Sequence, residues 1–378
     1  MLSSKTLSAG SKPHFMLLDG LRGVAALMVM CYHIFEAFAT SPFDQGFNHG
    51  YLAVDFFFVL SGFVVGYAYD DRRDTMSACQ FLRRRLIRLH PMIVIGAVFG
   101  LIAYILQGCV KWDGSAVSVS SILLSFFCAL LLIPAAPGAS YDVRGNTEMY
   151  PLNGPSWSLF FEYIGNIFYA IFLRRLSTPL LAVVVALSGV GLAWAALGNL
   201  SGFGHIGMGW SLADGNFLGG LLRMTFAFSA GLLMTRVFRP VRVRSPFLLC
   251  SLALVAILSV PYVGGPDRMW MNGLYDIFCV ACVFPFLVWI GASGAVGEAT
   301  RPSFVCRFLG DISYPVYAIH YPLMYLFYAW VWNNGYSFAD VWPMALAVIA
   351  GSVVLAWLSM RFYDMPVRRW LNRRFGAQ

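Results

Sequence analysis

Charged residues are scarce in this sequence, and their scarcity excludes an ordinary water-soluble domain. Asp, Glu, Lys and Arg make up 12% of the 378 residues, while hydrophobic residues make up 59%. Soluble domains carry about 25% charged residues. Apolar segments close to the roughly 20 residues needed to cross a bilayer recur along the whole chain. The sequence therefore predicts an all-α fold, a polytopic bundle of transmembrane helices.

Patterns typical of other protein classes are also missing. The short alternating segments of a membrane β-barrel are absent, and so is a glycine-rich phosphate loop. The stretch "LSGFV" lacks the second glycine of the serine elbow of soluble hydrolases. Cys279 and Cys282, the one C-x-x-C pair, lie in an apolar run, where packing explains them better than redox chemistry. We expect no metal and no disulfide.

The basic residues predict how the chain is threaded through the membrane. Apolar segments lie near residues 16–40, 51–69, 89–108, 118–134, 156–173, 179–198, 215–236, 246–263, 271–292, 306–331 and 341–363. Suppose that the N-terminus is cytoplasmic and that segment 118–134 does not cross the membrane. Of the 26 Lys and Arg residues, only Lys111, Arg144 and Arg268 then lie on the extracytoplasmic side, and Arg223 lies inside a span. The positive-inside rule favours this arrangement, because a crossing by 118–134 would move every later basic cluster outside.

We therefore predict ten spans in a single domain, residues 1–378, with short cytoplasmic tails at about 1–14 and 364–378. Segment 118–134 would be re-entrant or interfacial. The first apolar segment has no small-residue cleavage site behind it and is predicted to be a retained span. The net charge of +8 belongs to the cytoplasmic loops, and no basic face or stacking motif indicates nucleic acid as a partner.

The first span carries four ionisable residues, which are costly at membrane depth: Asp19, Arg22, His33 and Glu36. Arg22 and His33 are separated by three helical turns plus about 20°, so they share one face, about 16 Å apart along the axis. Glu36 can accept a proton from the His33 ring or orient it, and Asp19 can position Arg22. The alternative is structural: Arg22 snorkels to the surface and His33 hydrogen-bonds a carbonyl.

This span resembles the opening of the acyltransferase family 3 membrane proteins. Their signature is an Arg or Lys, ten residues and a His, which "LDGLRGVAALMVMCYH" matches with Arg22 and His33. Four further family motifs follow in order: "YLAVDFFFVLSGFVVGY", "FLRRRLIRLHPM", "NGPSWSLFFEYIGNIFY" and "DISYPVYAIHYPL". The departures are small: Met92 stands where an aromatic residue commonly follows the proline, and Gly23 where alanine is usual.

The resemblance implies acyl transfer from cytoplasmic acyl-CoA to a surface carbohydrate. His33 would be catalytic, and Arg22, Arg85 and Arg88 would hold the phosphates of coenzyme A. Arg85 and Arg88 are one turn apart at the cytoplasmic start of the third span, and guanidinium groups bind phosphate through forked hydrogen bonds. Topology anchoring is the alternative role, which we prefer for Arg72, Arg73 and Arg83.

Glu162 is the second predicted catalytic residue. It falls on the family's tryptophan–serine–glutamate motif, here Trp157, Ser158 and Glu162. Its depth below the outer surface, roughly 10 Å, matches that of His33, so the two could form an acid–base pair. A structural ion pair elsewhere in the bundle is the alternative.

Four further residues are predicted to support the site or line its pocket: Asp55, Ser61, His320 and Tyr321. A structural histidine explains His320 equally well, and Ser61 with Gly62 could serve only close helix approach. The remaining histidines lie at the termini or in loops and are assigned no chemistry: His14, His49, His90 and His205.

The predicted function is that of an integral-membrane O-acetyltransferase of the bacterial cytoplasmic membrane. It would move acetyl from acetyl-CoA, a co-substrate, to a hydroxyl of an extracytoplasmic glycan, with His33 as general base or transient acyl carrier. No tightly bound cofactor is expected. The oxyanion donor that this reaction needs cannot be identified from the sequence. Besides the acceptor and lipids, expected partners are polysaccharide-synthesis machinery or a second copy of the chain.

Two other functions stay open at this point. A member of the same family could acylate a secreted metabolite that is not a glycan. A small-molecule transporter would use the polar face of the first span without covalent chemistry. Many family members also carry a fused extracytoplasmic hydrolase-like domain, for which we expect this chain to be too short, so a separate protein could complete the transfer.

Overall fold

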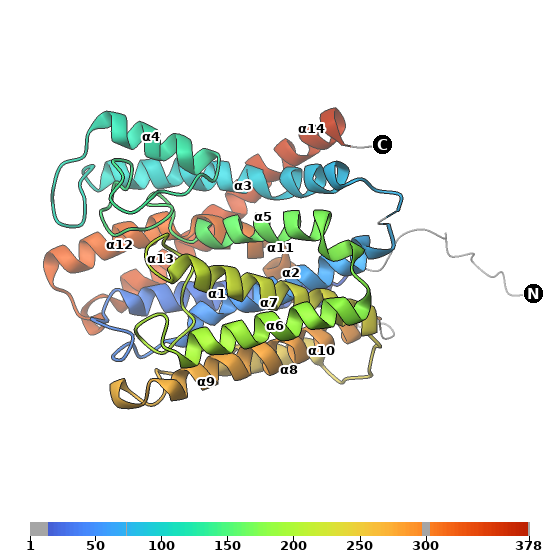
Figure 1. Cartoon of the computed structure of the whole chain (residues 1–378). Coiled ribbons are helices and arrows are strands. Elements are labelled where there is room, and N and C mark those ends of the chain that lie inside the picture. The colour runs from blue at the N-terminus through green and yellow to red at the C-terminus, as the bar shows by residue number, and fades with distance from the viewer. Residues whose placement is uncertain (1–13, 73, 297–302, 377–378) are drawn as a thin grey trace, which may run out of the picture.

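The protein is a bundle of helices that run side by side along one common direction (Figure 1). The computed structural model describes residues 14–72, 74–296 and 303–376. Within these residues, β structure is limited to two isolated bridges, Val110 with Ala116 and Glu148 with Ser211. The predicted all-α membrane bundle is confirmed.

Eight helical segments among the described residues are long and apolar enough to cross a membrane. They are built from α1 (Met16–Glu36), η1 (His49–Leu52) with α2 (Ala53–Tyr69) and η2 (Asp70–Arg72), α3 (Ala78–Leu106), α5 (Ser156–Ile171), α6 (Thr178–Leu197), α7 (Asn216–Val237), α9 (Trp270–Phe278) with α10 (Phe284–Val296), and α13 (Phe338–Ser359) with α14 (Met365–Phe375). The shorter helices are α4 (Val119–Leu130), α8 (Pro246–Leu258), α11 (Phe304–Ile319) and α12 (Tyr321–Asn334).

The shorter helices mean that the count of ten crossings stays a prediction. α4 has 12 residues, which is about 18 Å of helix against a hydrocarbon core of about 30 Å. Its length agrees with leaving segment 118–134 out of the full crossings. α8 has 13 residues and is shorter than the predicted span 246–263.

The predicted span 306–331 is not one helix but two, which meet at His320. Pro322 explains the interruption, because it has no N–H to donate to the Ala318 carbonyl and its ring crowds that carbonyl. The side-chain amide of Asn153 donates to the freed Ala318 oxygen at 2.8 Å instead. A neighbouring segment thus satisfies the backbone at the break, as the membrane interior requires.

Several pairs of helices among the described residues pack with their backbones in contact. α2 and α7 approach so closely that a Cβ built on Gly62 would lie 2.0 Å from the carbonyl oxygen of Phe228. α1 meets α11 in the same way, since a Cβ on Gly23 would lie 2.2 Å from the oxygen of Leu309. Small residues permit such approach in membrane bundles. The contact explains glycine at position 23, where the resemblance leads one to expect alanine.

Gly62→Ala is expected to destabilise the protein, because the added methyl group would have to push α7 away from α2. The matched control is Gly351→Ala in α13, where a Cβ meets no heavy atom within 4 Å. Alanine there should gain up to about 1 kcal/mol in helix propensity. The melting temperature of purified protein in detergent should fall for the first variant and hold or rise for the second. Equal melting temperatures would contradict the close contact.

The outer helices present apolar side chains where no protein covers them. On α6, Leu187 and Val190 are 68% and 70% exposed, and on α13 Val354 is 56% exposed. Continuous apolar surface of this kind on several outer helices is what lipid chains cover. The chain is an integral membrane protein.

Candidate active site

Two cavities lie within the bundle, and α1 contributes to both. The larger, of about 590 Å³, is lined by Arg22 of α1 and by arginines of α3 and α14, and is called the arginine cavity below. The smaller, of about 320 Å³, is lined by His33 and Glu36 and is called the histidine cavity. Among the described residues, Val54 and Tyr317 line both. The two cavities therefore adjoin each other along one helix.

The arginine cavity contains the three arginines that the sequence assigns to phosphate binding. Arg22, Arg85 and Arg88 all line it. The Arg22 guanidinium donates to the Ser313 hydroxyl at 2.9 Å and pairs with Asp19 at 3.0 Å. Asp19 is thus in contact with Arg22, as expected. Arg88 forms no ion pair within 4 Å in the described part of the chain, although Asp19, Glu162 and Asp364 line the same cavity.

Arg85 and Glu162 form an ion pair in the wall of the arginine cavity. Arg85 Nη2 lies 2.6 Å from Glu162 Oε1, which also accepts the Ser61 hydroxyl at 3.1 Å. Arg85 is buried, and its Nε has no hydrogen-bond partner among the described residues. An unsatisfied buried donor beside a cavity suits the oxygen of an anionic ligand.

His33 faces the histidine cavity with its ring held by Glu36. Nδ1 lies 2.8 Å from Glu36 Oε2. Beside an ionised carboxylate, which only accepts, Nδ1 is the donor, and a neutral imidazole in that tautomer presents a lone pair at Nε2. The Tyr328 hydroxyl lies 2.9 Å from the same Glu36 oxygen and 2.8 Å from the His33 carbonyl oxygen. This arrangement suits an imidazole that acts as base or nucleophile.

Comparison with known proteins decides the family. A family model described as an acyltransferase domain matches residues 17–361, a range that includes Arg22, His33, Arg85, Arg88 and Glu162. The chain belongs to the acyltransferase 3 family. Its relatives include acyltransferase MdmB of Streptomyces mycarofaciens, 26% identical over 94% of this chain and 92% of that protein.

Two further relatives of this acyltransferase have more specific names. The exopolysaccharide production protein ExoZ of Rhizobium meliloti is 26% identical over 72% of this chain and 76% of its own length. The peptidoglycan O-acetyltransferase OatA of Listeria monocytogenes is 24% identical over 95% of this chain, which spans 56% of OatA. No solved structure matches the chain. The protein is a membrane O-acyltransferase, and the transporter alternative is set aside.

In this acyltransferase, Glu162 and His33 do not form the expected pair, because they line different cavities. Equal depth fixes only the height of a residue in a bundle, and α5 turns Glu162 toward α2 and α3. The predicted acid–base pair is corrected to two separate pairs, Glu162 with Arg85 and Glu36 with His33. A catalytic role for Glu162 stays a prediction.

Asp55 lies in a buried ion pair with Arg223 of α7. Its carboxylate oxygens are 2.7 and 3.0 Å from Nη2 and Nε of the guanidinium, and neither side chain is more than 1% exposed. Arg223 also donates to the backbone oxygens of Met208 and Tyr51, and its guanidinium carbon is 5.2 Å from the Trp157 ring centroid. Arg223 lines the histidine cavity. Sequence reasoning missed it, although a lone arginine inside a span was a usable signal.

Of the remaining predicted residues, three line the cavities and His320 lines neither. Trp157 and Tyr321 line the histidine cavity, and Ser158 lines the arginine cavity. His320 is fully buried, and its Nδ1 hydrogen-bonds backbone carbonyl oxygens one turn back at 3.0 Å. Its ring centroid is 5.5 Å from that of His33. Nδ1 is thus satisfied by the backbone, whereas Nε2 is buried with no hydrogen-bond partner among the described residues, so the structural role and the pocket role of His320 both stay predictions.

Three loop residues of the histidine cavity were missed by the sequence analysis. Asn146 and Glu148 lie in the loop before α5, and Trp210 in the loop between α6 and α7. Burial raises the pKa of Glu148 to about 7, and the Tyr325 hydroxyl donates to its carboxylate. The available signal was the length of the loop, since long loops without secondary structure are often functional.

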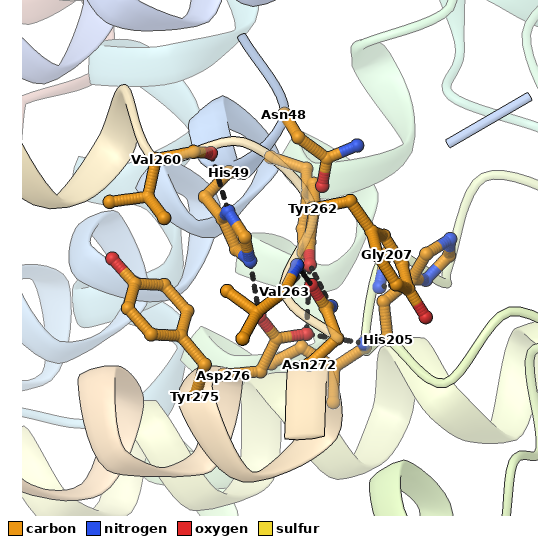
Figure 2. A network of polar contacts seen from close by, with 12 residues as sticks. Asn48, His49, His205, Gly207, Val260, Tyr262, Val263, Asn272, Tyr275 and Asp276 are labelled. Atoms are coloured by element: carbon orange, nitrogen blue, oxygen red, sulfur yellow. Dashed lines mark hydrogen bonds and ion pairs between the residues drawn. The ribbon is translucent and has the colours of Figure 1, made fainter. Parts of the chain in front are cut away.

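Figure 2 shows a buried polar network around His49 and Asp276. The network holds Tyr51, another wall residue of the histidine cavity. The Tyr51 hydroxyl donates to Asp276 at 2.9 Å, and the Asp276 carboxylate also accepts the Ile206 N–H at 2.9 Å. His49 Nδ1 donates to the Val260 carbonyl at 2.7 Å, and its Nε2 faces Asp276 at 3.6 Å. The network joins η1, α9 and two loops. The sequence places His49 in a loop, and the structure shows that it helps to hold these segments together.

Proposed function

We propose that this acyltransferase moves an acetyl group from acetyl-CoA, bound from the cytoplasm, to a hydroxyl of an extracytoplasmic glycan. The observation that carries the proposal is the adjacency of the two cavities, one lined with arginines and one holding His33. The names of two relatives, for exopolysaccharide production and peptidoglycan O-acetylation, support a glycan acceptor. The membrane would be the bacterial cytoplasmic membrane, with both chain termini inside.

The arginine cavity supports coenzyme A as the donor. Guanidinium groups bind phosphate through paired, charge-assisted hydrogen bonds. Arg88 and the free Nε of Arg85 are open to such contacts, while Asp19 and Glu162 hold Arg22 and Arg85 in place before the donor arrives. The thioester arm would then extend toward the wall that the two cavities share.

His33 would act at the junction in one of two ways. As a general base, Nε2 takes the proton of the acceptor hydroxyl while the hydroxyl oxygen attacks the thioester carbonyl. As a nucleophile, Nε2 attacks first and carries the acetyl group to the acceptor. Both routes need Nδ1 fixed and Nε2 free, which is the arrangement that the Glu36 hydrogen bond favours.

The histidine cavity has the side chains of a sugar-binding site. Tyr32, Trp157 and Trp210 give it aromatic walls, and Asn146 and Glu148 add hydrogen-bonding groups. Aromatic faces pack against the C–H faces of a sugar, while a few polar groups fix its hydroxyls. A glycan acceptor therefore fits the chemistry of this cavity.

Isolated membranes that contain the protein, supplied with labelled acetyl-CoA and a panel of acceptors, test the proposal. Label should enter a polysaccharide or its lipid-linked repeat unit and should be absent with membranes that lack the protein. Label found only in a small secreted metabolite would replace the glycan by that metabolite. Label found in no acceptor would contradict the proposal.

Glu148→Gln is expected to remove a pH dependence from acceptor binding. Burial raises the pKa of Glu148 to about 7, so the wild-type carboxyl loses its proton as the pH rises through neutrality. The ionised form accepts stronger hydrogen bonds from hydroxyls, so the acceptor KM should fall as pH rises through about 7. Glutamine does not titrate, so the ratio of variant to wild-type KM should rise severalfold. A ratio that is constant with pH would contradict a role for Glu148 in acceptor binding.

A further inference from the structure

We infer that Tyr317 supplies the hydrogen bond that stabilises the oxyanion of the transfer reaction, with the Ser158 hydroxyl as its partner. The inference rests on the proposed function. Attack on a thioester carbonyl places negative charge on its oxygen, and a donor fixed at that point is usually among the largest contributions to catalysis. Such a donor must reach both the thioester, entering through the arginine cavity, and the hydroxyl beside His33.

Tyr317 meets this requirement by its position. Of the two described residues that line both cavities, Val54 has no donor. Tyr317 is 5% exposed. Its ring lies edge-on to the ring of Phe57, and the two ring centroids are 5.2 Å apart. Its ring is also 6.0 Å from that of His320, which neighbours His33. The phenol is therefore a fixed hydroxyl at the junction.

Other donors of the histidine cavity are either already used or lie away from the junction. The Tyr51 hydroxyl donates to Asp276. Each nitrogen of the Arg223 guanidinium already has a carboxylate or backbone oxygen as its acceptor. Arg223, like Tyr32 and Tyr321, lines the histidine cavity alone. Using the Tyr51 hydroxyl for an oxyanion would strip the buried Asp276 carboxylate of its partner, which is unfavourable.

The hydroxyls of Ser158 and Tyr317 can hold their two hydrogens in two ways. Their oxygens are 2.5 Å apart, and Ser158 Oγ is 3.0 Å from the Pro155 carbonyl oxygen. When Ser158 donates to Pro155, Tyr317 must donate to Ser158. When Ser158 turns to donate to the Tyr317 oxygen, the phenol O–H is released toward the cavities. The Pro155 oxygen stays satisfied, because the Ser158 N–H donates to it at 3.1 Å.

The released phenol O–H acts during the bond changes of acetyl transfer. The acceptor hydroxyl gives its proton to His33 Nε2, its oxygen bonds to the thioester carbon, and the C=O π electrons move to the carbonyl oxygen, to which Tyr317 donates. On collapse the C–S bond breaks, and the sulfur of coenzyme A takes the proton from His33. Tyr317 keeps its own proton throughout. A route through acetyl-His33 forms the same kind of oxyanion, so the assignment holds for both routes.

Tyr317→Phe in the full-length protein, purified in detergent, tests the assignment. The kcat should fall by about 10²–10³-fold, while the KM values for acetyl-CoA and acceptor change by less than about threefold. Ser158→Ala keeps the phenol and should lose less than about tenfold. The matched control is Tyr104→Phe: this buried hydroxyl donates to the Val143 carbonyl at 2.8 Å but lines neither cavity, so kcat should stay at the wild-type level.

Fluorinated tyrosines at position 317 give a readout that a structural hydroxyl would not move. 3-Fluorotyrosine and 3,5-difluorotyrosine keep the ring and the O–H but make the phenol a stronger donor, so kcat should change stepwise with phenol acidity. A flat series, a Tyr317→Phe loss confined to KM, or equal losses in Ser158→Ala and Tyr317→Phe would overturn the assignment. An active wild type with an equally active Tyr317→Phe overturns this inference alone. A wild type without acetyl transfer overturns the proposed function and this inference with it.

Discussion

His33→Ala is expected to reduce acetyl transfer by about 10²–10⁴-fold, the usual contribution of a positioned general base. The imidazole is the group of the histidine cavity that combines a held Nδ1 with a free Nε2. His33→Gln should lose as much, because an amide hydrogen-bonds but does not take a proton. Initial rates of label transfer from acetyl-CoA, normalised to the amount of folded protein, measure the effect.

Arg88→Gln provides the contrast for that experiment. It removes a charge from the arginine cavity, so the KM for acetyl-CoA should rise while kcat at saturating donor stays near the wild-type value. His33→Ala should show the reverse, with donor binding intact and kcat lost. A His33→Ala protein that turns over within about tenfold of wild type would remove His33 from the chemistry.

The first span shows what sequence periodicity can establish. The eleven-residue spacing places Arg22 and His33 on one face of a helix, and the structure directs the two side chains into adjoining cavities. The spacing of His33 and Glu36 likewise predicts their contact, which is 2.8 Å. Relations within one helix follow from its fixed geometry, so the sequence is sufficient for them.

Relations between helices were much harder to predict. Depth along a span places Glu162 at the height of His33 but does not give the direction of its side chain, which points to Arg85. The break at His320 was readable from Pro322, whereas the Asn153 amide that satisfies the break comes from a distant loop. A side chain that lines two cavities, as Tyr317 does, is placed by the packing of several helices at once. The pattern of a single helix does not contain that information.

Arg223→Met is expected to cost about 3–5 kcal/mol of folding free energy, because it leaves the Asp55 carboxylate charged and unpaired inside the bundle. Neither side chain of the pair is more than 1% exposed, so the carboxylate left behind is a buried one. The loss should appear as a lower unfolding midpoint of the purified protein in detergent. Arg223 also lines the histidine cavity, so activity is measured separately, on the folded fraction.

A second substitution shows whether the stranded charge causes the loss. Asp55→Leu combined with Arg223→Met should be more stable than Arg223→Met alone, since a buried pair replaced by apolar side chains is often tolerated, whereas half a pair is not. The control pair, Arg236 with Asp70, joins the same two segments at 2.8 Å but is 13% and 22% exposed, so Arg236→Met should cost less. If the double variant is no more stable than Arg223→Met, or if Arg236→Met is equally damaging, burial of an unpaired charge does not set the energy of this contact.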